Sequence, residues 1–320
     1  MSDYKPPYTI TSKMVNIISA ISEELTKIEY NKNDIITPQL RKKNRVKTIS
    51  GTLEIEGNFL GEEKITALLD GKKVLGTYQE ILEVEGVINS YKEFENYKFD
   101  SLDDMLKSHK LLMDGILKTA GKLRAVNVQV GAHIAPPHGV VSRLMQELFV
   151  WLKNSDEHPL IKSCAFHYEF EFIHPFSDGN GRIGRLWQSV ILYSWREVFA
   201  TMPTESIVRD YQDDYYNALE KSTDIGESTP FIEFMLEVIL KTVRKVGNKV
   251  GSKVGNDFTE NQLLIIENIK INPKLSASKL SEIVGISKRK IEENLAKLKK
   301  LNILQRVGGT RGHWEIVDEI

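Results

Sequence analysis

The 320-residue sequence predicts a mainly α-helical protein with two folded parts. Apolar residues recur at intervals of three and four along much of the chain, which is the spacing of helices with one buried face. Short segments around residues 126–135 and 304–317 alternate as strands do. A four-residue repeat of Gly, Lys and Val is typical of a linker. We expect an N-terminal helical region over 1–100, a helical core over 101–244, the linker over 245–257 and a small domain over 258–320.

Composition restricts the class of protein. A hydrophobic content of 41% is typical of globular chains, and a net charge of -1 gives no field that attracts nucleic acid or membrane. Cys164 is the only cysteine, which excludes an internal disulfide framework and a cysteine-based zinc site. The N-terminus has no signal pattern, and no segment approaches the roughly 20 apolar residues of a membrane span. We expect a cytoplasmic protein without membrane association.

The N-terminal half contains three helical patterns. Residues 11–30 form an amphipathic helix, 62–100 are helical and charged, and 102–119 follow a capping turn at Ser101. His109 falls on the buried face of the third helix, and we interpret it as a structural histidine. Between the first two lies Thr52–Asn58, which we interpret as the end of a short helix that stops at Gly57.

The middle of the chain begins with a strand pattern. Val126, Val128 and Val130 alternate with polar residues, Gly131 offers a turn, and 133–135 return as a second strand. Helices then follow over 140–152 and 161–172, the second of which contains His167, interpreted as structural. Further helices are expected over 210–219 and from 229 to about 244.

The most informative stretch is 171–185, which has the pattern of a phosphate-binding turn that opens a helix. Gly179 and Gly181 can adopt the positive φ angles that let successive N–H groups point at one anion. The unsatisfied N–H groups of the following helix would face the same anion. Arg182 and Arg185 lie three residues apart and project from one side of the first turn. This arrangement suits a ligand with several phosphates.

Two further residues supply chemistry at this turn. His174 is a candidate general base, and Asp178 is a hard oxygen ligand for Mg²⁺. The segment also matches the G-x-G-x-x-G dinucleotide fingerprint, but no hydrophobic strand precedes it, so that interpretation is rejected. The sequence contains neither a G-x-x-x-x-G-K-[ST] P-loop nor an H-E-x-x-H zinc pattern.

The whole string resembles the signature of the Fic family, H-P-F-x-[DE]-G-N-G-R-x-x-R. Every fixed position is filled: His174, Pro175, Phe176, Asp178, Gly179, Asn180, Gly181, Arg182 and Arg185. The resemblance implies a Fic-type helical bundle with a β-hairpin flap. It also implies a protein adenylyltransferase that uses ATP and Mg²⁺ to transfer AMP to a Ser, Thr or Tyr hydroxyl of a target protein or of itself.

The resemblance assigns roles to residues. His174 would be the catalytic base and Asp178 the Mg²⁺ ligand. The flap, which pairs with an extended target segment, would comprise Val128, Gln129, Val130 and Gly131. The expected ATP-binding residues are Gly179, Asn180, Gly181, Arg182 and Arg185, with Tyr216 and Leu219 as candidates for the adenine wall.

The same family often carries an inhibitory segment, [ST]-x-x-x-E-[GN], which Thr52, Glu56 and Gly57 match. Glu56 would then pair with Arg185, occupy the position of the γ-phosphate and slow the reaction. In some relatives this glutamate also positions a water that removes AMP, so Glu56 has two candidate roles. Because Fic proteins often form pairs, a homodimer with Glu56 acting on a neighbour stays an alternative to action within one chain.

The C-terminal part has the pattern of a winged helix-turn-helix domain. Helices are expected over 261–271, 276–284 and 287–301, with a turn at Gly285, a cap at Ser287 and strands at 304–307 and 313–317. Basic residues that could contact DNA phosphates are Lys288, Lys290, Arg289 and Arg311. Glu292 and Glu293 on the same helix favour protein binding instead. The alternative function is a DNA-binding regulator with a nucleotide-sensing Fic core; transfer of a group other than AMP is the third hypothesis.

Overall fold

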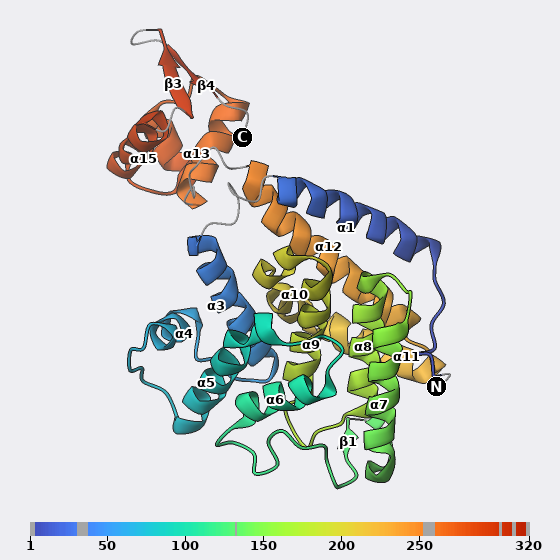
Figure 1. The fold of residues 1–320 in the computed structure, drawn as a ribbon. Helices are drawn as coiled ribbons and strands as arrows, with labels where there is room; N and C mark the ends of the chain where they lie inside the picture. Colours follow the sequence, from blue (N-terminus) through green and yellow to red (C-terminus); the bar gives the residue numbers. More distant parts are fainter. Residues whose placement is uncertain are drawn as a thin grey trace. The chain divides into compact units, whose positions relative to one another are not determined.

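The computed structural model describes residues 4–30, 38–131, 133–251, 260–300, 303–308 and 312–317. The chain divides into two compact units, with the boundary after Gly247. Helices dominate both units, which confirms the predicted mainly α-helical fold (Figure 1). Among the described residues, no helix combines the length and apolar character that crossing a bilayer requires.

The first unit consists of helices and one small hairpin. Its elements are α1 (Ser12–Tyr30), α3 (Pro38–Ile55), α4 (Glu62–Leu69), α5 (Tyr78–Lys92), η1 (Phe94–Asn96), α6 (Leu102–Met113), β1 (Gln129–Val130), β2 (His133–Ile134), α7 (His138–Asn154), α8 (Pro159–Ile173), α9 (Asn180–Trp195), η2 (Glu197–Thr201), α10 (Thr204–Asp210), α11 (Gln212–Ile225) and α12 (Thr229–Gly251).

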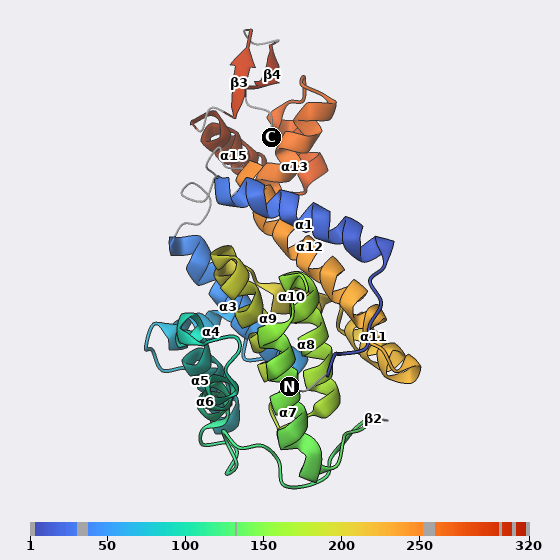
Figure 2. The ribbon, with the colours of Figure 1, turned by 45° about the vertical axis from the view of Figure 1, so that its right-hand side comes forward.

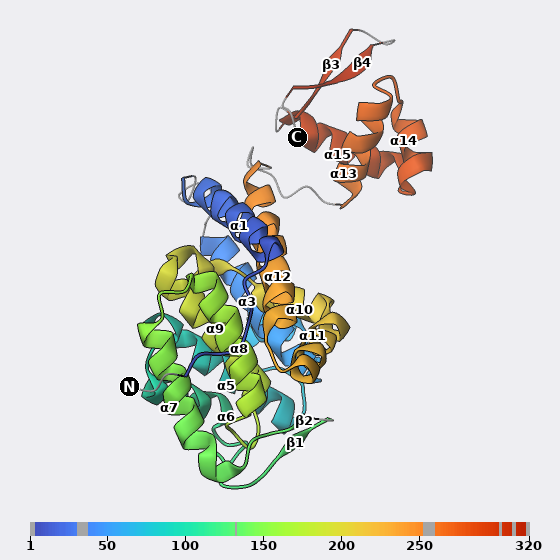
Figure 3. The same cartoon turned by 90° about the vertical axis from the view of Figure 1, so that its right-hand side faces the viewer.

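Helices α8 and α9 form the centre of this unit. They lie side by side in every view, with α7, α10 and α11 around them (Figures 1–3). α8 is buried on almost every face, as its apolar sequence requires, because a helix that is apolar all round belongs in a core. The aromatic side chains of Phe166, Phe170 and Trp187 are completely buried in this core. The loop between α8 and α9 carries the Fic-like signature, so the site lies at the end of the two most central helices of the unit.

Helix α3 packs tightly against α10. A Cβ atom on Gly51 would lie 2.7–2.8 Å from backbone atoms of Glu205 and Ser206, which is closer than real Cβ contacts. Glycine is therefore needed here for the two backbones to approach. The contact fixes α3 along its length, and Glu56 follows directly after the last residue of this helix.

Two expected helix boundaries were wrong, and one helix had no counterpart among the expectations. α6 ends at Met113, because Gly115 adopts φ +73° and the chain turns. α10 was not anticipated. α12 continues to Gly251, into the first part of the segment 245–257 that was expected to be a linker, and the rest of that segment lies outside the described residues. Val243 and Val246 are buried, and Gly247 approaches Ile28 of α1, so packing against α1 outweighs the low helix propensity of glycine.

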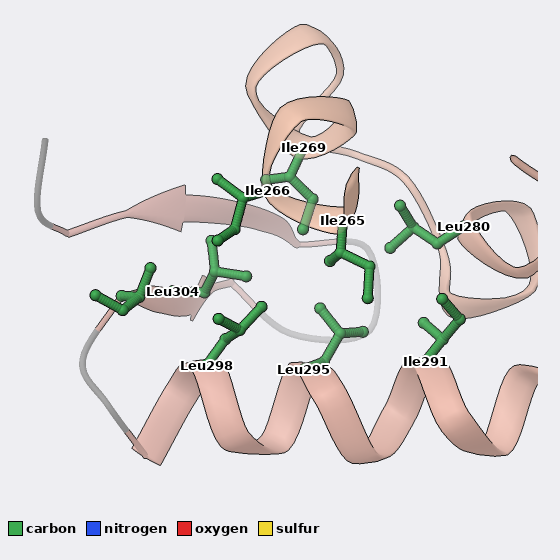
Figure 4. Close-up of a cluster of buried hydrophobic side chains, with 9 residues drawn as sticks. Ile265, Ile266, Ile269, Leu280, Ile291, Leu295, Leu298 and Leu304 are labelled. Atoms are coloured by element: carbon green, nitrogen blue, oxygen red, sulfur yellow. The ribbon is translucent and has the colours of Figure 1, made fainter. Parts of the chain in front are cut away.

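The second unit contains three helices and a hairpin. Its elements are α13 (Glu260–Ile271), α14 (Ala277–Val284), α15 (Lys288–Lys300), β3 (Leu304–Val307) and β4 (His313–Ile316), with the strands antiparallel. Figure 4 shows one apolar cluster in which Ile291, Leu295 and Leu298 of α15 face the isoleucines of α13. Gly285 adopts φ +76° after α14, and the Ser287 hydroxyl accepts from the Lys290 N–H, as expected. Arg311 lies outside the described residues.

Candidate active site

The loop between α8 and α9 begins with a strained residue. His174 caps α8 in the left-handed conformation, with φ 49° and ψ 62°. It is the only non-glycine residue with positive φ in the described part of the chain. Such a backbone costs on the order of 1–3 kcal/mol and persists where the surroundings fix it. The surroundings therefore fix the backbone from which the His174 side chain projects.

Two side chains fix the shape of the turn. The Asn180 carboxamide closes it on Phe176: its Oδ1 accepts from the Phe176 N–H at 2.9 Å, and its Nδ2 donates to the Phe176 carbonyl at 2.9 Å. His109 donates from Nε2 to the Asp178 carbonyl at 3.0 Å and accepts from the Gly121 N–H at 2.8 Å. Its ring stacks on Phe176, 3.7 Å between centroids. Burial lowers the pKa of His109 to about 4, so the ring is neutral.

These contacts decide two expectations. His109 is structural, as expected, because both ring nitrogens hold loop backbone. Asn180 was expected to bind ATP through its backbone or its side chain; both polar atoms of its side chain are used within the turn, and the residue is 2% exposed. Asn180 can contribute only its backbone N–H to an anion.

The start of α9 presents N–H groups that no side chain caps. The helix begins directly after Gly179, which adopts φ +81°. No side chain of Gly179 covers the helix end, so the first N–H groups are open to an anionic ligand. Gly181 lies in the first turn, where a Cβ atom would lie 2.6 Å from the Glu56 Oε1 atom. The space above Gly181 is therefore occupied by a carboxylate.

Two buried guanidinium groups flank these N–H groups. Arg182 is 5% exposed and Arg185 is 3% exposed. Arg182 Nη2 lies 3.5 Å from Asp178 Oδ1, while its Nε atom is buried without a hydrogen-bond partner in the described chain. Two buried cations in one turn are costly unless anions compensate them. The site is therefore suited to a ligand with more than one negative group.

Glu56 supplies one such negative group. Its Oε1 atom lies 2.7 Å from Arg185 Nη2, within the same chain. Arg185 also donates from Nε to the Thr52 hydroxyl at 3.1 Å and from Nη2 to the Thr52 carbonyl at 3.3 Å. Burial favours a higher pKa for the Glu56 carboxyl, but the positive charge of Arg185 outweighs this and holds the pKa below 4.5. Glu56 is therefore an anion at neutral pH.

The hairpin expected as a flap is present beside the loop. Gln129 pairs with Ile134 and Val130 with His133, antiparallel, and Gly131 turns the chain with φ +58°. Val130 and Ile134 expose 45% and 76% of their surface. His133 Nε2 lies 2.8 Å from the Phe172 carbonyl and donates to it, which ties β2 to the end of α8. The hairpin thus presents apolar side chains and free strand edges next to His174.

Helix α11 approaches the site from the other side. Gln212 donates to the Ile55 carbonyl at 3.2 Å, which joins the start of α11 to the end of α3. Tyr216 is 47% exposed, and burial together with the negative charge of Glu56 raises the pKa of its hydroxyl. Leu219, half-buried, lies one turn further along the same helix. The structure places Tyr216 close to the charged groups of the site, because its hydroxyl interacts with the charges of Glu56 and Arg185.

Comparison with known proteins identifies the family. The model of the Fic/DOC family matches residues 99–192. The crystal structure of a Fic family protein from Desulfovibrio desulfuricans G20 is 37% identical in sequence, with a TM-score of 0.75, and the similarity covers 99% of each chain. This chain belongs to the Fic family. The fold of Fic-1 from C. elegans is also similar, with a TM-score of 0.60 and 20% identity over 75% of this chain and 72% of that one.

Other relatives of this Fic protein carry a named activity. The protein adenylyltransferase Fic of Culex quinquefasciatus is 29% identical over 204 residues, and that of Aedes aegypti is 29% identical over 205 residues. The matches cover 60% of this chain in both cases, but only 39% and 40% of those proteins. The Fic chain therefore spans about two fifths of the length of these relatives.

The Fic structure also shows what sequence reasoning missed. Arg124 precedes the hairpin, is 3% exposed and donates to the carbonyl of His174 at 2.8 Å. His167 lies beneath α9, where its ring bonds the Gln188 carboxamide at 2.8 Å and the Tyr215 hydroxyl at 3.1 Å. It is structural, as expected. Arg124 carried no signal in the sequence, since a single arginine before a strand pattern is common on surfaces.

Proposed function

We propose that this Fic protein transfers AMP from ATP to a hydroxyl side chain of a protein and that Glu56 restrains the reaction. The observation that carries the proposal is the juxtaposition of a histidine base with an anion site that contains two buried arginines. Arg182 and Arg185 lie on the first turns of α9, and His174 precedes that helix. This combination supports phosphoryl-group chemistry, in which catalysis is mainly positioning and charge stabilisation.

Each residue then has a task. The N–H groups at the start of α9 and the guanidinium groups of Arg182 and Arg185 bind the phosphates and stabilise the charge that develops on them. The exposed edge of the hairpin holds an extended segment of the target by main-chain pairing. His174 takes the proton of the target hydroxyl as its oxygen bonds to the α-phosphorus, and pyrophosphate leaves. Tyr216 is placed to line the nucleoside end of the ligand.

Asp178 is the residue that would hold Mg²⁺. Its side chain is 57% exposed at the mouth of the turn, and no group of three or more metal-binding side chains occurs in the described part of the chain. A single carboxylate fits Mg²⁺, which commonly binds one or two carboxylates together with phosphate oxygens and water. When bound, the ion would neutralise phosphate charge.

Glu56 acts against ATP in this proposal. Its carboxylate pairs with Arg185 and covers Gly181, where a phosphate would otherwise bind. ATP must therefore displace or share this contact. The pair is formed within one chain, which favours restraint in cis. Positioning a water for removal of AMP stays a second proposed role of Glu56.

We expect the acidic limb of the kcat/KM profile for AMP transfer to lie below pH 6.5. Burial lowers the pKa of His174 from that value, although the charge of Glu171 partly opposes the shift. His174 is a competent base only when neutral, so activity is full above its pKa and is lost as the pH falls through it. Initial rates at subsaturating ATP, from pH 5 to 8, measure this limb. A limb above pH 7 would contradict the assignment of His174 as the base.

We expect Gly51→Ala to activate transfer and to destabilise the fold. The added Cβ would meet the backbone of α10 at 2.7–2.8 Å, so α3 must move and carry Glu56 with it. Overpacking of this kind costs about 1–3 kcal/mol. Gly139→Ala is the matched control, because nothing lies within 4 Å of its Cβ position in α7. Denaturant unfolding and transfer rates test the pair of variants. An unchanged rate in a destabilised Gly51→Ala protein would contradict the restraint of transfer by Glu56.

The class of reaction is tested with labelled ATP. We expect label at the α-phosphate to become bound to protein in the presence of Mg²⁺, and label at the γ-phosphate to be released in pyrophosphate. The Glu56→Gly variant is the enzyme of choice, with a mixed lysate as source of targets. Transfer of the γ-label would identify a kinase-type reaction instead. The same assay with GTP tests transfer of another nucleotide.

The second unit supports an alternative function as a DNA-binding regulator. The proposal of a winged helix-turn-helix domain is supported by three helices and an antiparallel hairpin around one apolar cluster. However, Lys288 lies 3.8 Å from Glu292 and Arg289 lies 3.2 Å from Glu293. These pairs reduce the positive potential of α15, so we rank protein binding above DNA binding. A salt-dependent affinity for random duplex DNA would reverse this order.

A further inference from the structure

Arg124 makes an unusual set of hydrogen bonds. Its Nε atom donates to the His174 carbonyl at 2.8 Å, and Nη1 donates to the Val126 carbonyl at 2.7 Å. Nη2 donates to the Pro136 carbonyl at 2.5 Å and to the Ile173 carbonyl at 3.2 Å. The backbone N–H of Arg124 donates to the Pro175 carbonyl at 2.9 Å. All these acceptors are main-chain carbonyls.

The acceptors belong to two segments of the site, the loop that carries His174 and the β1–β2 hairpin. Ile173, His174 and Pro175 form the end of α8 and the start of the catalytic loop. Val126 precedes β1 and Pro136 follows β2, so these two carbonyls lie at the two ends of the hairpin. A guanidinium is planar and rigid, so its donors fix their acceptors relative to one another. Arg124 therefore joins both arms of the flap to the backbone of His174.

The burial of Arg124 makes this arrangement costly. Arg124 is 3% exposed, and no carboxylate forms an ion pair with it in the described part of the chain. A buried cation that only carbonyls compensate is expensive. The carbonyl bonded at 2.8 Å belongs to His174, the residue with the strained left-handed backbone. Strain of this kind persists where neighbours over-determine the conformation.

We propose that Arg124 is a positioning residue that holds the flap and His174 in one fixed register. A target segment paired with the flap then presents its hydroxyl at a constant distance from the histidine. The proposal rests on the proposed AMP transfer for its functional consequence, but the mechanical coupling of flap and loop is independent of the reaction. In the described part of the chain, none of the hydrogen bonds of Arg124 reaches the N–H groups at the start of α9, so its effect on ATP binding is small.

The test compares Arg124→Lys with Arg143→Lys, both in a Glu56→Gly chain. Arg143 is the control because its side chain is 61% exposed and pairs with Glu147. Lysine keeps the charge but cannot donate to four carbonyls. We expect amide hydrogen exchange in Arg124→Lys to rise on the order of tenfold, together, in peptides spanning 126–136 and 173–178. The rate of AMP transfer to a target should fall at least about tenfold relative to Arg143→Lys. The ATP affinity, measured by calorimetry, should stay within about twofold of that control.

The outcomes separate the coupling from the chemistry. Faster exchange in only one of the two peptides, or in neither, would overturn the proposal. So would undiminished transfer, or a loss of ATP affinity as large as the loss of transfer. If even the Arg143→Lys chain transfers no AMP, the proposed function fails, and the exchange data alone decide the coupling. If Arg124→Lys does not fold, Arg124→Gln replaces it. If circular dichroism shows that neither Arg124 variant folds, the role of Arg124 is purely structural and the proposal is contradicted.

Discussion

Replacement of His174 is expected to reduce AMP transfer about 10²–10⁴-fold in a chain that also carries Glu56→Gly. The reduction follows from the loss of the group that accepts the hydroxyl proton, while the N–H groups and arginines that bind phosphate remain. ATP affinity should therefore change little. Initial rates at saturating ATP, together with calorimetric titration of ATP, measure the two effects separately.

The choice of variant matters because His174 has φ 49°. Alanine is strained in this region, whereas asparagine tolerates it. We expect His174→Asn to match the inactivity of His174→Ala while retaining a melting temperature closer to that of the parent. An asparagine variant that keeps more than a tenth of the parent rate would exclude proton abstraction by His174.

Removal of Glu56 is expected to have the second-largest effect. Glu56→Gly should raise AMP transfer about tenfold to a hundredfold, because a hydrogen bond between charged groups is worth about 1.5–3 kcal/mol and ATP no longer competes with it. The same change leaves Arg185, only 3% exposed, without its anion. The variant without nucleotide should therefore lose about 1–3 kcal/mol of unfolding free energy.

The faster transfer and the lower stability of Glu56→Gly are both tested by the effect of ATP on its melting temperature. Added ATP supplies the missing negative charge, so we expect it to raise the melting temperature of Glu56→Gly more than that of the native chain. Glu56→Gln is the matched control, since it keeps the shape and loses the charge, and should be intermediate in rate. The depressed pKa of Glu56 means that its stabilising contact is present above its unfolded pKa and is lost only as the pH falls through the folded value. Equal ATP-induced shifts in all three chains would contradict competition at Arg185.

Much of the fold followed from periodic patterns. α8 and α9, the hairpin near residue 130 and the three helices of the second unit lie close to where spacing, glycines and capping residues placed them. The structure brings His174, Arg182, Arg185 and Glu56 together, although Glu56 lies more than a hundred residues from the others. The glycine-rich turn before a helix predicted the anion site of Arg182 and Arg185. The place of Glu56 followed only from the resemblance to the Fic inhibitory segment.

Other features depended on tertiary contacts that no local pattern reveals. The glycines near residue 247 argued against a helix, yet packing of Val243 and Val246 extends α12 beyond them. The sequence did not show where the Asn180 carboxamide points. In the structure it forms hydrogen bonds with the backbone of Phe176. Gly51 became informative once α10 was seen against it. In each case the residue that makes the contact is either distant in sequence or has nothing in the local sequence that points to the contact.

The central claim is AMP transfer under restraint by Glu56, and intact mass tests it most directly. The native chain, Glu56→Gly and Glu56→Gly with His174→Ala would be incubated with Mg-ATP, alone and with a mixed lysate. The account predicts a mass increment of one AMP group on Glu56→Gly or on a lysate protein, far less with the native chain and none in the double variant. Absence of the increment from every protein in both incubations would contradict AMP transfer, and equal increments with the native chain and Glu56→Gly would contradict the restraint.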